Sequence, residues 1–408
     1  MLMESIIKKT LGLKSYRIER VFFQGEELVA RIVARKGSRP VCSGCGKKRP
    51  GYDTLGERFW RHVPCWGIRV GLVYGPRRVR CPECGIKVEA IPWSRGKSPL
   101  SVPLIIVLAA FAKRLPWEDV GRLFGLHWNT VKAAVRHVVD YGLEHRDVSG
   151  ILYIGIDELS RRRGQTYVTM VYDLLSGDLL WVGDGREKKS LEQFFAEWGK
   201  ERIEAILGIC CDMWEPYADV IRQMAPNAIL VFDKFHIVKH LMTAVDEVRR
   251  QEVAEKGQQH KDLVKGTRYI WLKNPWNLTD KQKIRLSELE KLNLKINRAY
   301  LLKEQFRQFW DYLYPANAKK FLTQWFWWAT HSRLKPMRDF AWMLRRHEED
   351  ILNYFKLRIT GGRIEGVNRK AKVISQRCYG FRTFGTFRLA LYHGLGNLPV
   401  PELAHKFL

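Results

Sequence analysis

Two short β-rich segments of this chain each end at an aspartate, and this pattern constrains the fold more than any other feature. The apolar run Ile151 to Ile156 leads into Asp157, and the run Ile203 to Cys211 leads into Asp212. Further extended segments alternate with helices in the same region. The expected strands are 151–156, 167–172, 179–182, 203–211 and 228–232, and the expected helices are 189–200 and 215–224.

Three antiparallel strands followed by two helix and strand pairs are the layout of a ribonuclease-H-like α/β core. In that fold the first and fourth strands are neighbours, so Asp157 and Asp212 are expected close together at one edge of the sheet. Two divalent ions held roughly 3.5–4 Å apart by carboxylates activate a nucleophile and stabilise the leaving oxygen of a phosphodiester. We therefore predict that both aspartates bind Mg²⁺ (or Mn²⁺) and are catalytic.

Two further acids near this pair are expected to have other roles. Asp233 follows the fifth strand, one strand further out, and precedes His236 by three residues. It is expected either to cap the next helix with a hydrogen bond to His236, or to support the metal site together with that histidine. Glu158 is adjacent to Asp157 in the first strand, so its side chain is expected to point to the opposite face.

A third metal-binding acid is expected far along the chain. The sequence from about 239 to 357 is helical, which predicts an all-α insertion into the core. Glycines then break the helix, and Glu365 begins another with its charge near the positive end of the helix dipole. A surface ion pair with Arg369 is the simple explanation of Glu365, and a role as the third metal ligand is the one we favour. The cations expected to hold DNA phosphates here are Arg363, Arg369, Lys370 and Lys372.

The net charge indicates a polyanionic partner. The 408 residues include 70 Lys and Arg against 43 Asp and Glu, for a formal net charge of +27. An enzyme acting on small molecules gains nothing from such self-repulsion, whereas nucleic acid neutralises it. No membrane partner is expected, because the longest apolar run, Leu104 to Ala112, is far below the roughly 20 residues of a spanning helix. The N-terminus has no signal-peptide core, so a cytoplasmic protein is expected.

Two C-x-x-C pairs predict a metal site of another kind. Four thiolates in a tetrahedral array suit a structural Zn²⁺, and a reducing compartment disfavours disulfides. His62 or Cys65, which lie between the pairs, could replace one ligand. The expected zinc ligands are Cys42, Cys45, Cys81 and Cys84. The basic segment before the second pair is expected to contact DNA through Arg77, Arg78 and Arg80.

The next segment has the pattern of a helix-turn-helix. An apolar helix is expected at 102–114, a second helix begins after Pro116, and Gly125 lies in the turn before a third helix that runs to about Tyr141. The third helix would enter a major groove, although an ordinary three-helix packing unit gives the same pattern. Its expected DNA-contacting residues are Trp128, Asn129, Lys132 and Arg136.

These patterns divide the chain into six segments. They are an N-terminal leader with short strands (1–40), a zinc-binding domain (41–98), the helix-turn-helix (99–145), the first part of the ribonuclease-H-like core (150–240), the all-α insertion (241–356) and the C-terminal part of the core (357–408).

The order of these motifs resembles a known family. The segments I-G-I-D-E, V-F-D-K-F-H-I-V-K-H-L and G-R-I-E-G-V-N-R-K-A-K, after the cysteine pairs and the helix-turn-helix, look like those of the DDE transposases of bacterial insertion sequences, specifically the ISL3 family. The resemblance implies that Asp157, Asp212 and Glu365 form the acidic triad. It also implies Mg²⁺ dependence, recognition of terminal inverted repeats in double-stranded DNA by the N-terminal half, transfer to target DNA, and action as a homo-oligomer, at least a dimer on DNA.

Two other functions share parts of this pattern. A DNA-binding regulator with a zinc finger and a helix-turn-helix would bind one sequence without cutting it, and the presence of all three acids argues against it. A structure-selective nuclease would cut according to DNA shape, and the two separate DNA-reading modules argue against that function.

Overall fold

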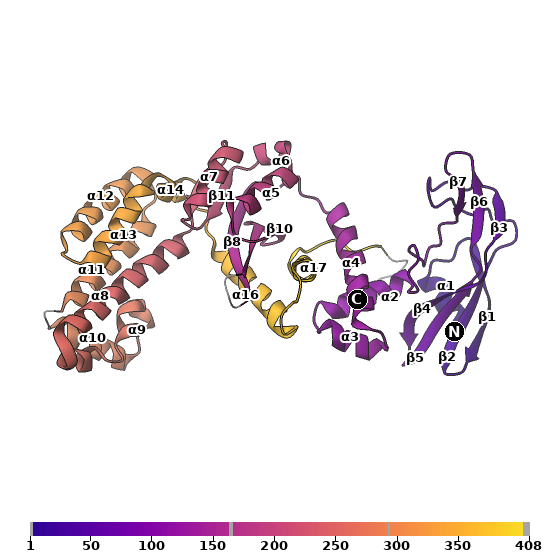
Figure 1. The fold of residues 1–408 in the computed structure, drawn as a ribbon, viewed down its shortest axis with the longest axis horizontal. Coiled ribbons are helices and arrows are strands. Elements are labelled where there is room, and N and C mark those ends of the chain that lie inside the picture. The colour runs from indigo at the N-terminus through magenta and orange to yellow at the C-terminus, as the bar shows by residue number, and fades with distance from the viewer. Residues whose placement is uncertain (1–2, 163–165, 293, 403–408) are drawn as a thin grey trace. The chain divides into compact units, whose positions relative to one another are not determined.

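The computed structural model describes residues 3–162, 166–292 and 294–402, and it divides the chain into two compact units (Figure 1). Unit 1 comprises Met1–Asp147 and Ile374–Leu408, and unit 2 comprises Val148–Val373. Each unit buries its own apolar side chains. No helix in the described part of the chain has the length and apolar character needed to cross a membrane.

Unit 1 begins with helix α1 (Met3–Thr10) and a four-stranded sheet in the order β1-β2-β5-β4. Its strands are β1 (Tyr16–Gln24), β2 (Glu27–Ala34), β4 (Arg58–Cys65) and β5 (Ile68–Tyr74). Because β2 pairs with both β1 and β5, the predicted leader shares one sheet with strands that lie between the two cysteine pairs. Trp60 and Trp93 meet edge to face in the core of this sheet.

A smaller sheet in unit 1 carries the cysteines. It has the order β3-β6-β7, with β3 (Gly51–Thr54), β6 (Arg77–Cys81) and β7 (Gly85–Val88). Cys81 is the last residue of β6, and Gly85 begins β7 after a tight turn. The φ angle of Gly85 is +73°, a conformation that glycine adopts without steric cost.

The helices of unit 1 are α2 (Val102–Ala112), α3 (Trp117–Phe124), α4 (Trp128–His145) and α17 (Phe384–Leu395). Gly125 ends α3 in the left-handed conformation, at the predicted turn. Gly121 in α3 allows close approach of the chain before α4, because a Cβ atom there would lie 2.5 Å from the carbonyl oxygen of Leu126. The helix α17 packs on α4, so the end of the chain from Ile374 belongs to this unit.

Unit 2 contains a five-stranded sheet in the order β10-β9-β8-β11-β12. Its strands are β8 (Tyr153–Arg162), β9 (Thr166–Asp173), β10 (Leu179–Asp184), β11 (Gly208–Cys211) and β12 (Ile229–Phe232). β8, β9 and β10 are antiparallel, whereas β11 is parallel to both β8 and β12. β8 and β11, which are the first and fourth strands of this sheet in chain order, are therefore neighbours, as the sequence predicts.

Three helices lie between the later strands of this sheet. The helices α5 (Lys188–Trp198) and α6 (Lys200–Glu204) connect β10 to β11, and α7 (Glu215–Met224) connects β11 to β12. Phe194 and Trp198 of α5 and Tyr217 of α7 join the strands in one core. The prediction of a strand from Ile203 was wrong at its start, because Ile203 lies in α6 and β11 begins only at Gly208.

Helices follow β12 as far as residue 377, and they include the stretch from about 239 to 357 that was predicted to be helical. They are α8 (Lys234–Val264), α9 (Arg268–Leu272), α10 (Asp280–Glu290), α11 (Lys295–Gln308), α12 (Pro315–His331), α13 (Lys335–Arg346), α14 (Glu348–Leu352), α15 (Tyr354–Leu357) and α16 (Gly362–Arg377), with 3-10 turns at Pro275–Asn277 and Phe309–Asp311. Phe306 of α11 and Trp325 of α12 are fully buried where these helices meet.

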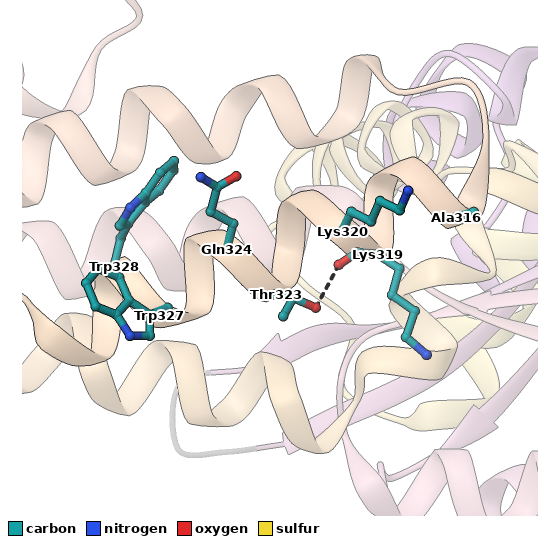
Figure 2. A pocket seen from close by; sticks show the side chains of 7 residues that line it. All are labelled: Ala316, Lys319, Lys320, Thr323, Gln324, Trp327 and Trp328. Atoms are coloured by element: carbon teal, nitrogen blue, oxygen red, sulfur yellow. Dashed lines mark hydrogen bonds between the residues drawn. The ribbon is translucent and has the colours of Figure 1, made fainter.

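One face of α12 is exposed. Trp325 points into the helical core, but Trp327 is 58% exposed. A shallow cavity of about 810 Å³ runs along this face, and Figure 2 shows its lining side chains on successive turns of the helix. The lining residues are Ala316, Lys319, Lys320, Thr323, Gln324, Trp327 and Trp328.

Candidate functional site

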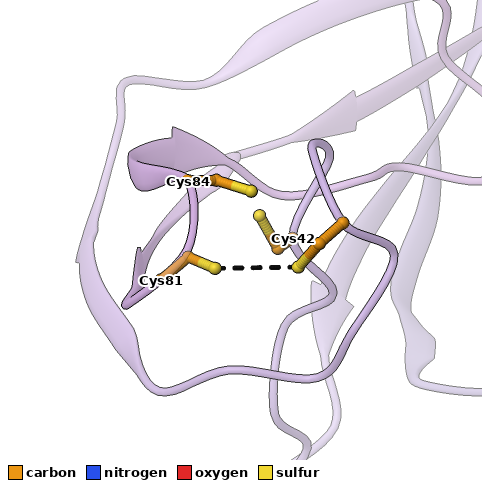
Figure 3. Close-up of side chains that lie close together, drawn as sticks. Cys42, Cys81 and Cys84 are labelled. Atoms are coloured by element: carbon orange, nitrogen blue, oxygen red, sulfur yellow. Dashed lines mark hydrogen bonds between the residues drawn. The ribbon is translucent and has the colours of Figure 1, made fainter.

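The cysteine pairs come together at one end of the small sheet of unit 1. The Sγ atoms of Cys42, Cys45, Cys81 and Cys84 all lie within 4.8 Å of one another. Figure 3 shows the Sγ atoms of Cys42, Cys81 and Cys84 directed towards a common centre. The distance between Cys45 Sγ and Cys81 Sγ is 3.6 Å, close to the roughly 3.8 Å edge of a tetrahedron with Zn–S bonds of about 2.3 Å.

Backbone geometry supports a thiolate at Cys42. The amides of Cys45 and Gly44 donate to Cys42 Sγ and lower the pKa of that thiol. The φ angle of Gly46 is +70°, which allows the first pair to turn tightly. The four donor atoms therefore fit a tetrahedral Zn²⁺.

The two alternative zinc ligands lie outside this cluster. His62 is buried in β4, and its Nδ1 atom is 2.9 Å from Ser101 Oγ. Cys65 ends the same strand. Within the described residues, the group of potential ligand atoms contains the four predicted cysteines and neither of these side chains.

The basic segment before the second cysteine pair has mixed surroundings. Arg77 forms a buried ion pair with Glu89 at 2.8 Å and also donates to the carbonyl oxygen of Ser38. Glu89 further accepts hydrogen bonds from two tyrosine hydroxyls of the four-stranded sheet, so the pair of Arg77 and Glu89 helps to hold the two sheets together. Arg78 pairs with Asp53, whereas Arg80 is exposed above the Tyr52 ring.

The four predicted contact residues of α4 lie at or near the surface. Trp128, Asn129 and Arg136 are exposed, and Lys132 is half-buried with its Nζ atom 5.9 Å from the centre of the Trp128 indole ring. His127 caps the helix, because its Nδ1 atom accepts from the Asn129 amide. The opposite face of α4 is buried through Val131, Ala134, Val135, Val138 and Val139.

In unit 2, parallel pairing aligns the two predicted aspartates. Cys210 of β11 is in register with Gly155 of β8, and Asp212 and Asp157 each lie two residues further along. The strand β8 does not end at Asp157, because it continues to Arg162 as the partner of β9. Both carboxylates therefore lie at the edge where β11 ends.

The carboxylate of Asp157 is held by two hydrogen bonds. The Glu158 amide donates to Oδ1 at 2.7 Å, and Asn368 Nδ2 of α16 donates to Oδ2. Asn368 is itself fixed by Tyr172, whose hydroxyl donates to Asn368 Oδ1 at 3.1 Å. Burial raises the pKa of Asp157, and the negative charge of Asp212 adds to the rise, whereas these hydrogen bonds and His236 oppose it.

Asp212 and Asp233 both lie near His236. The Met213 amide donates to Asp212 Oδ1 at 2.6 Å, and His236 Nδ1 lies 3.4 Å from the same oxygen. The distance from His236 Nδ1 to Asp233 Oδ2 is 3.9 Å. His236 therefore lies close enough to interact electrostatically with both carboxylates.

Asp233 connects the sheet to the last helix of unit 2. It caps α8 by accepting from the Phe235 amide, and the same oxygen accepts from the Gly361 amide at 3.0 Å. Gly361 approaches so closely that a Cβ atom there would lie 2.6 Å from Asp233 Oδ2. Of the two predicted roles, the structure contains the helix cap but not the expected hydrogen bond to His236, whose Nδ1 atom is 3.9 Å from Asp233 Oδ2. It adds a contact that fixes the start of α16.

Glu365 lies on α16, but its carboxylate does not join the two aspartates. Its Oε1 atom accepts from Arg369 at 3.0 Å, the surface ion pair considered from the sequence. Within the described residues, the cysteine cluster is the one group of three or more potential ligands that are mutually close. Asn368, three residues after Glu365, is the α16 side chain that contacts Asp157.

The cations of α16 are mostly exposed. Arg369, Lys370 and Lys372 lie on its solvent side, whereas the side chain of Arg363 lies outside the described residues. Their exposure leaves the predicted phosphate-binding charges accessible on the helix that also carries Glu365.

Sequence reasoning missed two residues near the acids. Asn368 and Tyr172 support Asp157. The i+3 spacing places Asn368 on the same side of the helix as Glu365, but this spacing does not specify that Asn368 contacts Asp157. Glu158 is not a simple surface residue, because burial raises its pKa to about 7, and the charges of Asp157 and Asp212 also raise it, against the opposing charge of Arg186.

Comparison with known proteins agrees with this architecture. A family model described as a transposase matches residues 154–391, and another, described as the zinc finger of the IS204, IS1001, IS1096 and IS1165 transposases, matches residues 38–84. The transposase for insertion sequence element IS1557 of Mycobacterium tuberculosis is 30% identical over 384 residues, which cover 88% of this chain and 86% of that protein. The transposase for insertion sequence element IS1001 of Bordetella parapertussis is 28% identical over 389 residues, covering 94% and 96%.

These matches define the class as a transposase with an N-terminal zinc ribbon. The chain belongs to the ISL3 family of insertion-sequence transposases. The zinc-ribbon match and the geometry of the four cysteines together support a structural zinc ion in unit 1.

Proposed function

We propose that this protein binds the terminal inverted repeats of an insertion sequence and catalyses metal-dependent cleavage and strand transfer. The observation that carries the proposal is the alignment of Asp157 and Asp212 at one edge of adjacent parallel strands, with α16 bonded to Asp157. The strand order β10-β9-β8-β11-β12 is that expected for a ribonuclease-H-like core. In such a core, the proposed catalytic residues are Asp157, Asp212 and Glu365.

The two aspartates suit hard divalent cations, because carboxylate oxygens are the ligands that Mg²⁺ and Mn²⁺ prefer. Bound ions of this kind lower the pKa of an attacking water and neutralise charge on the leaving oxygen. Asn368 and the Glu158 amide hold the Asp157 carboxylate in place. His236 Nδ1 lies 3.4 Å from Asp212 Oδ1.

Glu365 must turn away from Arg369 to become the third ligand. The ion pair between them is exposed, with side chains 43% and 77% accessible, and pairs of this kind contribute little to stability. A DNA phosphate that binds Arg369 would compete for its guanidinium and release the Glu365 carboxylate. Substrate binding would thus help to complete the site.

The chemistry proceeds in two displacements at phosphorus. In the first, water attacks the phosphodiester at the element end, the P–O3′ bond breaks, and the products are a 3′-hydroxyl and a 5′-phosphate. In the second, that 3′-hydroxyl attacks a phosphodiester of the target DNA and displaces its 3′-oxygen. Positioning and charge neutralisation dominate such transfers, which suits acids flanked by Arg369, Lys370 and Lys372.

Recognition of the DNA is assigned to unit 1. The helices α3 and α4 are proposed to form the helix-turn-helix, with Trp128, Asn129, Lys132 and Arg136 facing a major groove. Of the three arginines predicted to contact DNA before the second cysteine pair, Arg80 is the exposed one. Pairing of two element ends requires at least two DNA-binding protomers, so we propose a homo-oligomer on DNA.

The test is cleavage of labelled element-end DNA with Mg²⁺. Wild-type protein is expected to cut at the repeat boundary, and Asp157→Asn and Glu365→Gln are expected to bind the same DNA without cutting it. Asp280→Asn removes an acid whose side chain is 94% exposed on α10 and serves as the matched control. Full activity of Glu365→Gln would remove this residue from the triad, and sequence-specific binding without cleavage by the wild type would favour a regulator.

A further inference from the structure

The end of α16 presents a tyrosine in an unfavourable backbone conformation. Tyr379 has a φ angle of +53°, and its side chain is 99% exposed. The Gly380 amide donates to the Ser375 carbonyl and the Tyr379 amide to the Gln376 carbonyl, which is the pattern of a Schellman helix end. Tyr379 takes the position in this motif that glycine usually occupies. No burial of the ring offsets the strain, so the conformation indicates a role outside folding.

The loop that carries Tyr379 is firmly attached on both sides. Arg377 donates to the Lys113 carbonyl oxygen at 2.8 Å, and the Phe381 ring packs on Trp117 of α3 with centroids 6.0 Å apart. Thr383 then caps α17 by accepting from the Thr386 amide. The exposed ring is therefore held at a defined place in unit 1.

A cavity of about 680 Å³ lies beside this ring. It is bounded by α3, the start of α4 and the loop of Tyr379. Its lining combines aromatic rings with charged side chains, and the four cations exceed the two acids. The aromatic residues are Trp117, Trp128, Tyr379 and Phe381, the cations are Arg122, Lys132, Arg377 and Arg382, and the acids are Glu118 and Asp119.

The two acids of the cavity share one cation. Glu118 and Asp119 both pair with Arg122, at 2.7 and 3.4 Å. The remaining cations leave the lining positive, so an anionic ligand is favoured. Rings on the rim offer flat surfaces on which a nucleobase stacks, whatever its sequence. A nucleotide combines both properties, because it joins a planar base to a phosphate.

We propose that this cavity takes up one unstacked base of the bound DNA, with Tyr379 as the residue on which the base stacks. The inference rests on the proposed DNA-binding function and adds a ligand and a residue to it. Two residues expected to contact DNA, Trp128 and Lys132, line the same cavity. A base displaced from a duplex bound to α4 would therefore find the cavity within the same unit.

The test compares two duplexes of identical random sequence. One is fully paired and the other carries a single unpaired 2-aminopurine, and binding is measured by anisotropy without added Mg²⁺, so that cleavage plays no part. Full-length wild-type protein is expected to prefer the bulged duplex and to quench its 2-aminopurine fluorescence. Tyr379→Ala is expected to lose about tenfold of this preference, the size of one stacking contact, and Tyr379→Phe is expected to keep it.

Two further variants separate stacking from folding. Tyr379→Gly relieves the left-handed backbone, so it is expected to raise the melting temperature while the preference and the quenching are lost. Tyr314→Ala removes a tyrosine that is 67% exposed in unit 2 and is expected to change neither.

Several outcomes would overturn the proposal. The first is that the wild type binds both duplexes equally, and the second is that Tyr379→Ala keeps the preference for the bulged duplex. The third is that Tyr379→Ala loses the same affinity for both duplexes. This third outcome would indicate a general DNA contact or a protein-binding loop. Failure of the proposed cleavage is recognised separately, because it appears in the Mg²⁺ assay while the bulge preference remains.

Discussion

The cysteine cluster of unit 1 and the acidic site of unit 2 differ in how complete they are within the folded chain. All four Sγ atoms of the cluster already lie within 4.8 Å of one another, so they can bind one metal ion together. The acidic site has two aligned aspartates, but Glu365 is paired with Arg369 on the helix surface. The difference fits the proposed roles, because a structural site must be closed to stabilise the fold, whereas a catalytic site must admit its substrate.

The first prediction tests the closed site and has the largest expected effect. Cys81→Ala is expected to abolish zinc binding and to unfold the β3-β6-β7 sheet, because the binding energy of a structural zinc is folding energy. Zinc content by a colorimetric chelator and thermal melting provide the measurement. Cys65→Ala, which removes a cysteine outside the cluster, should keep the full zinc content.

The second prediction tests how the open site is supported. Asn368→Ala removes the side chain that holds Asp157 Oδ2, and such supporting contacts are typically worth about 10–100-fold in metal affinity or activity. The Mg²⁺ concentration for half-maximal cleavage should rise accordingly, while DNA binding stays unchanged. Asn317→Ala, at an exposed position of α12, is the control. An unaltered Mg²⁺ dependence would show that Asp157 does not need this support.

The third prediction tests the anchor of α16. Gly361→Ala would place a Cβ atom 2.6 Å from Asp233 Oδ2, and the resulting shift is expected to cost about 1–3 kcal/mol of stability and to lower cleavage. Denaturant unfolding measures the first effect. Gly366→Ala has open space around its Cβ position and should instead stabilise the helix by about 0.5–1 kcal/mol. Equal melting of the two variants would contradict the close contact at Gly361.

The fourth prediction concerns pH and has the smallest effect. Burial raises the pKa of Glu158 from 4.5 to about 7 in the folded chain, so folding favours its protonated form. The contribution of Glu158 to the free energy of unfolding, measured as the difference between the wild type and Glu158→Gln, is therefore largest below pH 4.5. This contribution is lost as the pH rises to about 7. After allowance for partial exposure, a decline of about 1–2 kcal/mol is expected in the absence of Mg²⁺. A constant difference across this range would mean that Glu158 titrates normally.

Much of the fold was predictable because its signals are local. Apolar runs marked the strands around Asp157 and Asp212, and the C-x-x-C pairs marked the cluster. The start of β11 was misplaced because β-branched and apolar residues such as Ile203, which is partly buried in α6, also occur where a helix packs on the core. The role of Arg77 was also hidden, since its partner Glu89 is identified only by the pairing of β6 with β7.

The sequence by itself determined which reactive and charged groups this protein has: four thiols in two tight turns, carboxylates after strands, and a strongly basic surface. Only the tertiary structure decided that Asn368 contacts Asp157 and that Glu365 pairs with Arg369. The physical reason is sequence separation. Contacts across 211 residues depend on how the helical insertion returns α16 to the sheet, and no local pattern specifies which face of that helix meets the strands.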